Sequence, residues 1–144
     1  MAVLTIDEIN IGDEYSKTVL FDKERVIEFI NFTQDTASIH IDKEFSNKKG
    51  FENLVVHGFG LSILFSRILG LELPGENTVI GSLNLDFHKP VYIGDTVQYT
   101  VTVKRIVKPL GSVTLELKAS KTNTDETCVL GKAVCVFVNK GDKE

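Results

Sequence analysis

Two residues that can exchange protons stand close together in the sequence, because Asp35 comes five positions before His40. A carboxylate can act as a general base, and an imidazole can hold or pass a proton near neutral pH. On a continuous helix these side chains would point about 140° apart. The intervening Thr36, Ser38 and Ile39 are weak helix formers. We therefore expect the helix to unwind after the carboxylate, so that both side chains can turn toward one point.

The simpler alternative for this pair is structural. Asp35 could solvate a helix end while His40 is a hydrogen-bonded loop residue, and histidine–carboxylate pairs of this kind are common. If the pair does act in catalysis, the position of Asp35 helps, because a carboxylate at the negative end of a helix dipole is a better base.

A second candidate lies at His57 and Gly58, where an almost entirely apolar stretch begins. Gly58 and Gly60 each cost about 1 kcal/mol relative to alanine in a helix, which suggests that something must approach the backbone there. The first N–H groups of a helix are free and lie at the positive end of its dipole. Aimed at a thioester carbonyl, they would stabilise an enolate oxygen. Close packing between helix and sheet is the alternative explanation.

The remaining polar residues give weaker signals. Ser66 lies two turns into the same apolar stretch and could bind a substrate or its own backbone. His57 lies near the expected start of the helix, where a structural role would suffice, and His88 is expected at a strand end. The three histidines have no metal-ligand spacing, so we predict no metal. We also predict no cofactor, because the chain has no nucleotide-binding motif.

The elements that must position these residues follow from the spacing of the apolar side chains. Residues 12–20 are expected to form a strand. A helical period begins after Asp22, a good N-cap, and should end near Asp35. A second short helix is expected between Asp42, as its cap, and Gly50, as its end.

Residues 57–69 form the most apolar part of the chain. Apolar side chains cover most of a helical wheel, which predicts a buried helix, and Gly70 is expected to end it. The chain after that helix alternates between apolar and polar residues, which predicts antiparallel strands with one buried face at 82–88, 96–105 and 112–120. A last strand over about 128–139 is apolar on both faces. We predict an α+β domain whose sheet wraps around the buried helix, and its open edges point to a dimer.

Length and composition exclude several classes of protein. The 144 residues predict one domain over 1–144, and a net charge of −4 gives no basic field for nucleic acid or for a membrane surface. The acidic N-terminus is not a signal peptide, and no apolar run reaches the length of a bilayer span. We therefore expect a cytoplasmic protein. Cys128 and Cys135 are expected to be small buried residues without a disulfide.

Four stretches of this chain resemble the MaoC-like hydratases, and most of all the single-domain (R)-specific enoyl-CoA hydratases. They are Phe32–His40, Val55–Gly58, Leu73–Gly75 and Phe87–Asp95. The resemblance extends over about residues 15–138 and so makes the chain a single MaoC-like domain. It implies a hot-dog fold, in which an antiparallel sheet wraps around a long central helix. It also implies a homodimer with its active sites at the subunit interface.

The resemblance further implies a hydro-lyase that hydrates trans-2-enoyl-CoA to (R)-3-hydroxyacyl-CoA or catalyses the reverse dehydration. Asp35 and His40 would hold one water, which Asp35 deprotonates for attack on C3, and a proton would return to C2 from the same side. The Gly58 amide would bind the thioester oxygen. Ser66, together with His57 and Phe59 beside the glycine, would form the substrate-binding set. The expected partner is an acyl-CoA or acyl-carrier-protein thioester.

The chain departs from the family's catalytic motif, roughly Ser-Gly-Asp-x-Asn-Pro-Leu-His, at Gln34, a position that varies in the family, and more importantly at Ala37 and Ser38. Ala37 stands in place of the asparagine and Ser38 in place of the proline. Two alternatives to a hydratase therefore stay open. One is a hot-dog thioesterase, in which water attacks C1, although a histidine five residues after the acid favours the hydratase. The other is a catalytically silent acyl-thioester binding subunit, which the missing asparagine would support.

Overall fold

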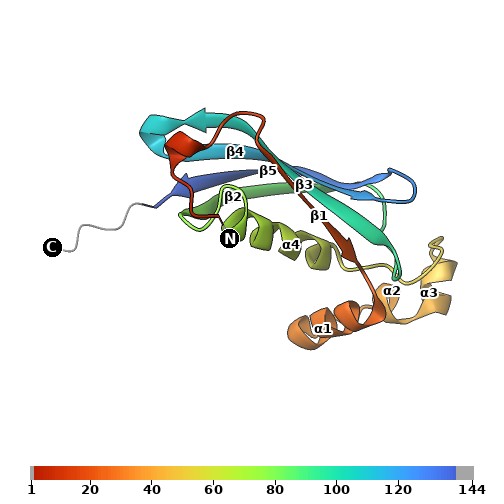
Figure 1. Ribbon diagram of the computed structural model, residues 1–144. Coiled ribbons are helices and arrows are strands. Elements are labelled where there is room, and N and C mark those ends of the chain that lie inside the picture. Colours follow the sequence, from red (N-terminus) through yellow and green to blue (C-terminus); the bar gives the residue numbers. More distant parts are fainter. Residues whose placement is uncertain (1, 139–144) are drawn as a thin grey trace.

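The computed structural model describes residues 2–138 and contains one five-stranded antiparallel sheet (Figure 1). The strand order is β1-β3-β4-β5-β2, so β1 and β2 form the two edges. The strands are β1 (Glu14–Leu20), β2 (Thr78–Phe87), β3 (Thr96–Val107), β4 (Ser112–Lys121) and β5 (Thr127–Phe137), and single 3-10 turns occur at Ile6–Glu8 and Lys108–Leu110. The predicted strands are all present, although the end of the last one, at residue 139, lies outside the described residues.

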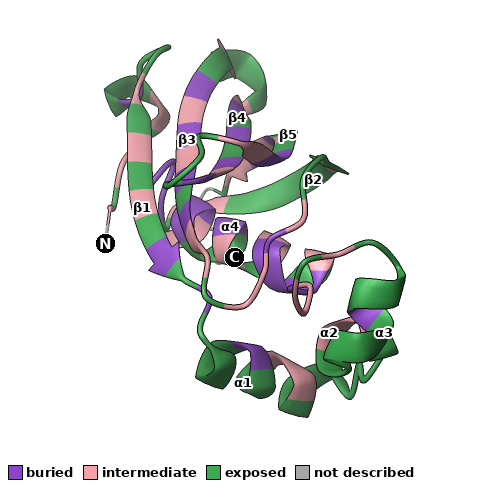
Figure 2. Cartoon of the chain, turned by 90° about the vertical axis from the view of Figure 1, so that its right-hand side faces the viewer, coloured by how far each residue is buried: buried purple, intermediate pink, exposed green. Residues whose placement is uncertain are grey.

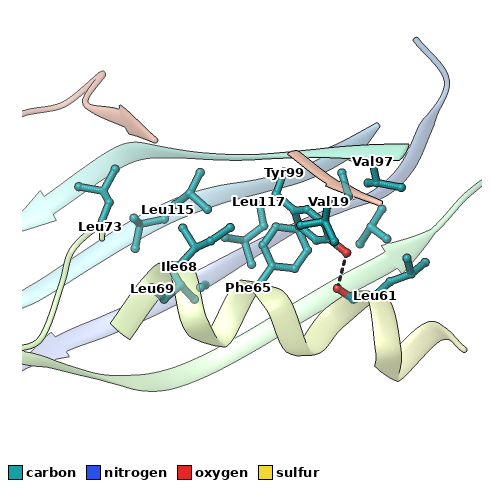
Figure 3. Packing of buried hydrophobic residues seen from close by; sticks show 14 of the residues in the cluster. Val19, Leu61, Phe65, Ile68, Leu69, Leu73, Val97, Tyr99, Leu115 and Leu117 are labelled. Carbon is teal, nitrogen blue, oxygen red and sulfur yellow. Dashed lines mark hydrogen bonds between the residues drawn. The ribbon is translucent and has the colours of Figure 1, made fainter. Parts of the chain in front are cut away.

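Helix α4 (Gly58–Leu71) runs along one face of the sheet, as the apolar stretch predicts (Figure 1). Phe65 and Ile68 are fully buried against residues of the inner strands, including Leu115 and Leu117 (Figure 3). A sheet wrapped on a long helix is the hot-dog arrangement, so the expected α+β fold class is confirmed. Gly70 does not end this helix. It lies inside the last turn, and the helix ends one residue later at Leu71.

Three short helices lie beside the sheet and carry the candidate pair (Figure 1). They are α1 (Lys23–Thr33), α2 (Ser38–Ile41) and α3 (Lys43–Lys48). Asp22 caps α1 by accepting from the Arg25 amide at 2.9 Å, and Asp42 caps α3 by accepting from the Phe45 amide at 3.0 Å. Both caps are therefore as predicted. Helix α2 was not predicted, because its four residues are too few to give a period and no side chain caps its start.

Strand β2 differs from its prediction in one important respect. Its alternating apolar residues should have formed a buried face, but Leu83 and Phe87 are about half exposed, at 45% and 54%. Figure 2 shows most of β2 in the colour of exposed residues. The alternation correctly indicates a strand with one apolar face. The face is uncovered because β2 is an edge strand and α4 fills only part of the space beneath it.

Two smaller expectations concern the cysteines and the membrane. Cys128 and Cys135 are buried and free, as predicted, and burial raises the pKa of Cys135 to about 11. Within residues 2–138, no helix has the length and apolar character that a membrane crossing would require.

Candidate active site

Asp35 lies just past the end of α1, where the chain leaves the helix through a left-handed residue. Gln34 has φ 60° and its amide donates to Ile30 O at 2.7 Å, which ends the helix slightly earlier than predicted. The Asp35 amide then donates to Thr33 Oγ1 at 3.2 Å, and its Oδ1 accepts from the Ala37 amide at 3.2 Å. The side chain is exposed, so its second oxygen stays free to act on a ligand.

His40 is held in place by a backbone carbonyl. In α2 its Nδ1 donates to Val55 O at 2.6 Å, since a carbonyl can only accept. Val55 is fixed in turn by a bridge to Tyr92 and by donation from its own amide to Ile39 O at 3.1 Å. The Nδ1–H tautomer leaves the Nε2 of His40 as the nitrogen available to a water or a substrate.

His57 lies beneath this pair and is only 3% exposed. Its Nε2 donates to the backbone oxygen of Asp35 at 3.0 Å, and its ring stacks on His40 with centroids 3.7 Å apart. One ligating atom each from Asp35, His40 and His57 lies within 4.8 Å of the others. Burial lowers the pKa of His57, an effect that the hydrogen bond to Asp35 partly opposes, so the ring is neutral near pH 7.

The same three residues could in principle surround a cation, given the spacing of their ligating atoms. One nitrogen of each ring is already hydrogen-bonded to a backbone carbonyl. His40 bonds to Val55 O, and His57 bonds to Asp35 O. Those bonds fix the orientation of the two rings. The absence of a metal stays a prediction.

An apolar groove of about 690 Å³ lies beside the three residues, between α1, α4 and β2. The two most exposed of its aromatic side chains are Phe32 and Phe59, at 81% and 84%. Neither Asp35 nor His40 lines the groove itself, but Thr33, whose hydroxyl accepts from the Asp35 amide, and Gly58, which follows His57, both do. The full lining consists of Phe29, Phe32, Thr33, Gly58, Phe59, Ser62, Ile63, Ser66, Leu69, Ile80, Leu83, Leu85 and Phe87.

Gly58 is the first residue of α4 and lines the groove. Its amide has no acceptor within the helix, as for every residue of a first turn, while its carbonyl accepts from Ser62 Oγ at 2.8 Å. A Cβ at this position would approach the Phe87 ring to 3.3 Å, tighter than ordinary contact. The glycine therefore makes room for the Phe87 ring of β2, which supports the alternative explanation of close packing between helix and sheet.

The predicted site residues fall into two groups. Ser66 and Phe59 line the groove, as expected of substrate-binding residues, whereas His57 does not. It lines a second cavity of about 220 Å³ between α1 and α4, so its contacts are with the pair. Sequence reasoning did not identify Val55 as the anchor of His40. It also missed the groove wall on β2, which the apolar alternation of that strand indicated without showing what it faces.

Comparison with known proteins agrees with this geometry. The sequence model of a family described as MaoC like domain matches residues 8–126. The chain is 30% identical over 133 residues to an (R)-specific enoyl-CoA hydratase from Aeromonas caviae, covering 91% of this chain and 97% of that protein. It is 32% identical over 133 residues to a mitochondrial 3-hydroxyacyl-acyl-carrier-protein dehydratase from Arabidopsis thaliana, covering 91% of this chain and 79% of that protein.

Two solved structures have a fold similar to that of this chain. The (R)-hydratase from A. caviae involved in PHA biosynthesis superimposes with a TM-score of 0.85 at 28% identity, over 91% of this chain and 98% of that one. A MaoC-like dehydratase from Rhodospirillum rubrum, at 20% identity, shares the fold with a TM-score of 0.75 over 95% of this chain and 99% of that one.

Removing the His57 imidazole should make the fold less sensitive to acid. Above pH 6.5, the ordinary pKa of the ring, it is neutral in both states. The pKa of His57 is lower in the folded protein than in the unfolded chain. As the pH falls below 6.5, the unfolded chain therefore binds a proton on this ring before the folded protein does, and the free energy of unfolding decreases. We expect the free energy of unfolding, measured by urea titration at pH 7.5 and 5.5, to fall less for His57→Gln than for the wild type. The exposed His88, changed to Gln, is the matched control and should behave like the wild type. Equal losses in all three proteins would contradict a buried neutral ring.

Proposed function

Because this chain belongs to the MaoC-like family, we propose that it catalyses the (R)-specific hydration of trans-2-enoyl-CoA thioesters, or the reverse dehydration of (R)-3-hydroxyacyl thioesters. It is thus a hydro-lyase, in keeping with the names of its relatives. The observation that carries the proposal is the convergence of Asp35 and His40 beside the free first turn of α4, at one end of an apolar groove.

Asp35 and His40 act on the same water molecule. The carboxylate of Asp35 takes a proton from the water while the oxygen of that water bonds to C3 of the enoyl thioester. The Nε2 of His40 holds the same water, since Nδ1 already donates to Val55. As the C3–O bond forms, the electrons of the double bond move onto the thioester oxygen, and a proton then returns from the site to C2. Run backward, the same steps release water.

The Gly58 amide stabilises the charge that develops on the thioester oxygen. It lies at the positive end of α4 and lacks an intrahelical acceptor, so it can donate to an enolate oxygen. The apolar groove beyond it accepts the acyl chain, with Phe59 and Ser66 in its wall. The thiol carrier is coenzyme A or acyl carrier protein, as the names of the relatives suggest. A cytoplasmic location stays a prediction.

We also propose that the chain acts as a homodimer, with the β2 face in the interface. This face joins exposed apolar residues of the edge strand to those of α4, including Ile80, Leu83 and Ile63. A contiguous apolar surface of this kind is typical of an association site. Sedimentation should give twice the mass of one chain, and Leu83→Glu should shift the protein to monomer. Leu110→Glu, which places the same charge at an exposed 3-10 turn, should stay dimeric. A wild-type monomer at micromolar concentration would contradict the proposal.

Replacing the carboxylate should abolish turnover without disturbing the loop. Asp35→Asn keeps the oxygen that accepts from the Ala37 amide but cannot take a proton from water. We expect a loss of about 10²–10⁴-fold in kcat, measured from the enoyl-thioester absorbance of crotonyl-CoA. Asp125→Asn is the control, because asparagine tolerates the positive φ of that exposed turn. Release of thiol by the wild type would instead identify a thioesterase, and neither reaction would identify a silent binding subunit.

The two motif departures have a definite structural meaning, because Ala37 is the N-cap of α2 and Ser38 its first residue. An asparagine cap supplies about 0.5–2 kcal/mol over alanine, and proline fits the first helical position. The ψ of 136° at Ala37 also suits a residue before proline. We expect Ala37→Asn, alone and with Ser38→Pro, to raise kcat for crotonyl-CoA by up to about tenfold, equivalent to about 1.4 kcal/mol, because α2 orients His40. Unchanged kcat would show that Val55 alone fixes the ring.

A further inference from the structure

The His57 side chain contacts both members of the candidate pair. Its Nε2 donates to Asp35 O at 3.0 Å, and its ring stacks on His40 at 3.7 Å with the planes 23° apart. On its other side it packs against Phe29, with ring centroids 4.8 Å apart. The three rings and the Asp35 backbone therefore form one packed unit.

The backbone of the same residue begins α4. His57 O accepts from the Leu61 amide at 3.0 Å, which closes the first turn, and Gly58 follows it directly. One residue thus joins the loop that carries the carboxylate to the helix start that carries the candidate oxyanion donor. A shift of its ring would change the distance between those two groups.

The protonation state of His57 follows from its contacts. Since the Asp35 carbonyl can only accept, Nε2 carries the hydrogen and Nδ1 holds a lone pair. Nδ1 is buried and has no hydrogen-bond partner within residues 2–138. The charged or titratable groups around the ring are Asp35 and His40, with Arg25 and Glu28 across the second cavity. A neutral ring fits this setting, because a charged one would stack directly on His40.

Stability alone does not account for an imidazole here. A buried polar atom without a partner lowers the stability of a fold, and an apolar ring of similar size would avoid that cost. The feature that an apolar ring could not supply is the N–H that holds Asp35. This contrast favours a role for His57 in the reaction rather than in folding only.

We infer that His57 is a positioning residue: its ring sets the distance and orientation of the Asp35–His40 pair relative to the Gly58 amide, without contacting the substrate. This inference rests on the proposed hydration. In this role the Nε2–H of His57 holds the Asp35 loop, and the face of its ring packs against His40. The positioning role also explains why His57 lies outside the substrate groove.

Two substitutions separate the parts of this role. His57→Gln keeps an amide N–H at the place of Nε2 but loses the ring, whereas His57→Phe keeps the ring and loses the donor. A misplacement of about 1 Å can cost about 10²-fold in rate, so we expect kcat for crotonyl-CoA to fall by about that factor in His57→Phe. Its KM should change by less than about threefold, because binding is not the affected step. His57→Gln should recover kcat to within about tenfold of the wild type. His88→Phe is the matched control and should leave both constants unchanged.

The outcomes distinguish this inference from the proposed function. An inactive wild type overturns the hydratase proposal, whereas an active wild type with unchanged kcat in a folded His57→Phe overturns the positioning role. Equal losses in the Gln and Phe variants would also overturn it, because keeping the Nε2 donor would then not rescue kcat. An activity-independent measurement completes the test. The imidazole 15N shifts of the wild type at pH 7.5 should show hydrogen on Nε2 of His57, and hydrogen on Nδ1 would overturn the inference whatever the turnover.

Discussion

The burial of α4 against the sheet is the constraint on which the candidate site depends. Phe65 and Ile68 are fully buried, and burying a side chain of this size stabilises a fold by about 1.5–3 kcal/mol. The hydroxyl of the buried Tyr99 donates to Leu61 O at 2.8 Å, which fixes the first turn of the helix (Figure 3). Burial also raises the pKa of Tyr99, so this donor keeps its proton at any physiological pH. The position of the Gly58 amide therefore follows from the core.

The candidate catalytic residues are held by hydrogen bonds to backbone carbonyls. Val55 O holds His40, and Asp35 O holds the ring of His57. The anchor at Val55 is itself supported from the sheet, because it bridges to Tyr92, whose amide donates to Asp95 Oδ2 at 2.8 Å. Lys121, only 8% exposed, pairs with that carboxylate at 3.3 Å. An exposed loop thus obtains its geometry from buried contacts on a neighbouring strand.

Much of this arrangement can be read from the sequence where the signal is local. The caps Asp22 and Asp42 predict two helix starts, and the nearly all-apolar wheel of 57–69 predicts the buried helix. Signals that depend on distant contacts fail. The spacing of Asp35 and His40 predicts a break in the helix but not α2, which is too short for a period and lacks a side-chain cap.

Two other failures share a physical cause, because each concerns a side chain whose partner lies far away in the chain. Alternation along β2 identifies an apolar face but not that the groove, rather than the core, lies against it. The sequence indicates only that His57 lies near a helix start. No local pattern reveals that its ring donates a hydrogen bond to Asp35, 22 positions earlier in the chain. The same long reach gives the residue its importance. A contact that joins two distant segments can set the geometry between them, which no residue within either segment can do. The apolar core positions α4, and the hydrogen bond from His57 to Asp35 O links the loop to the start of that helix.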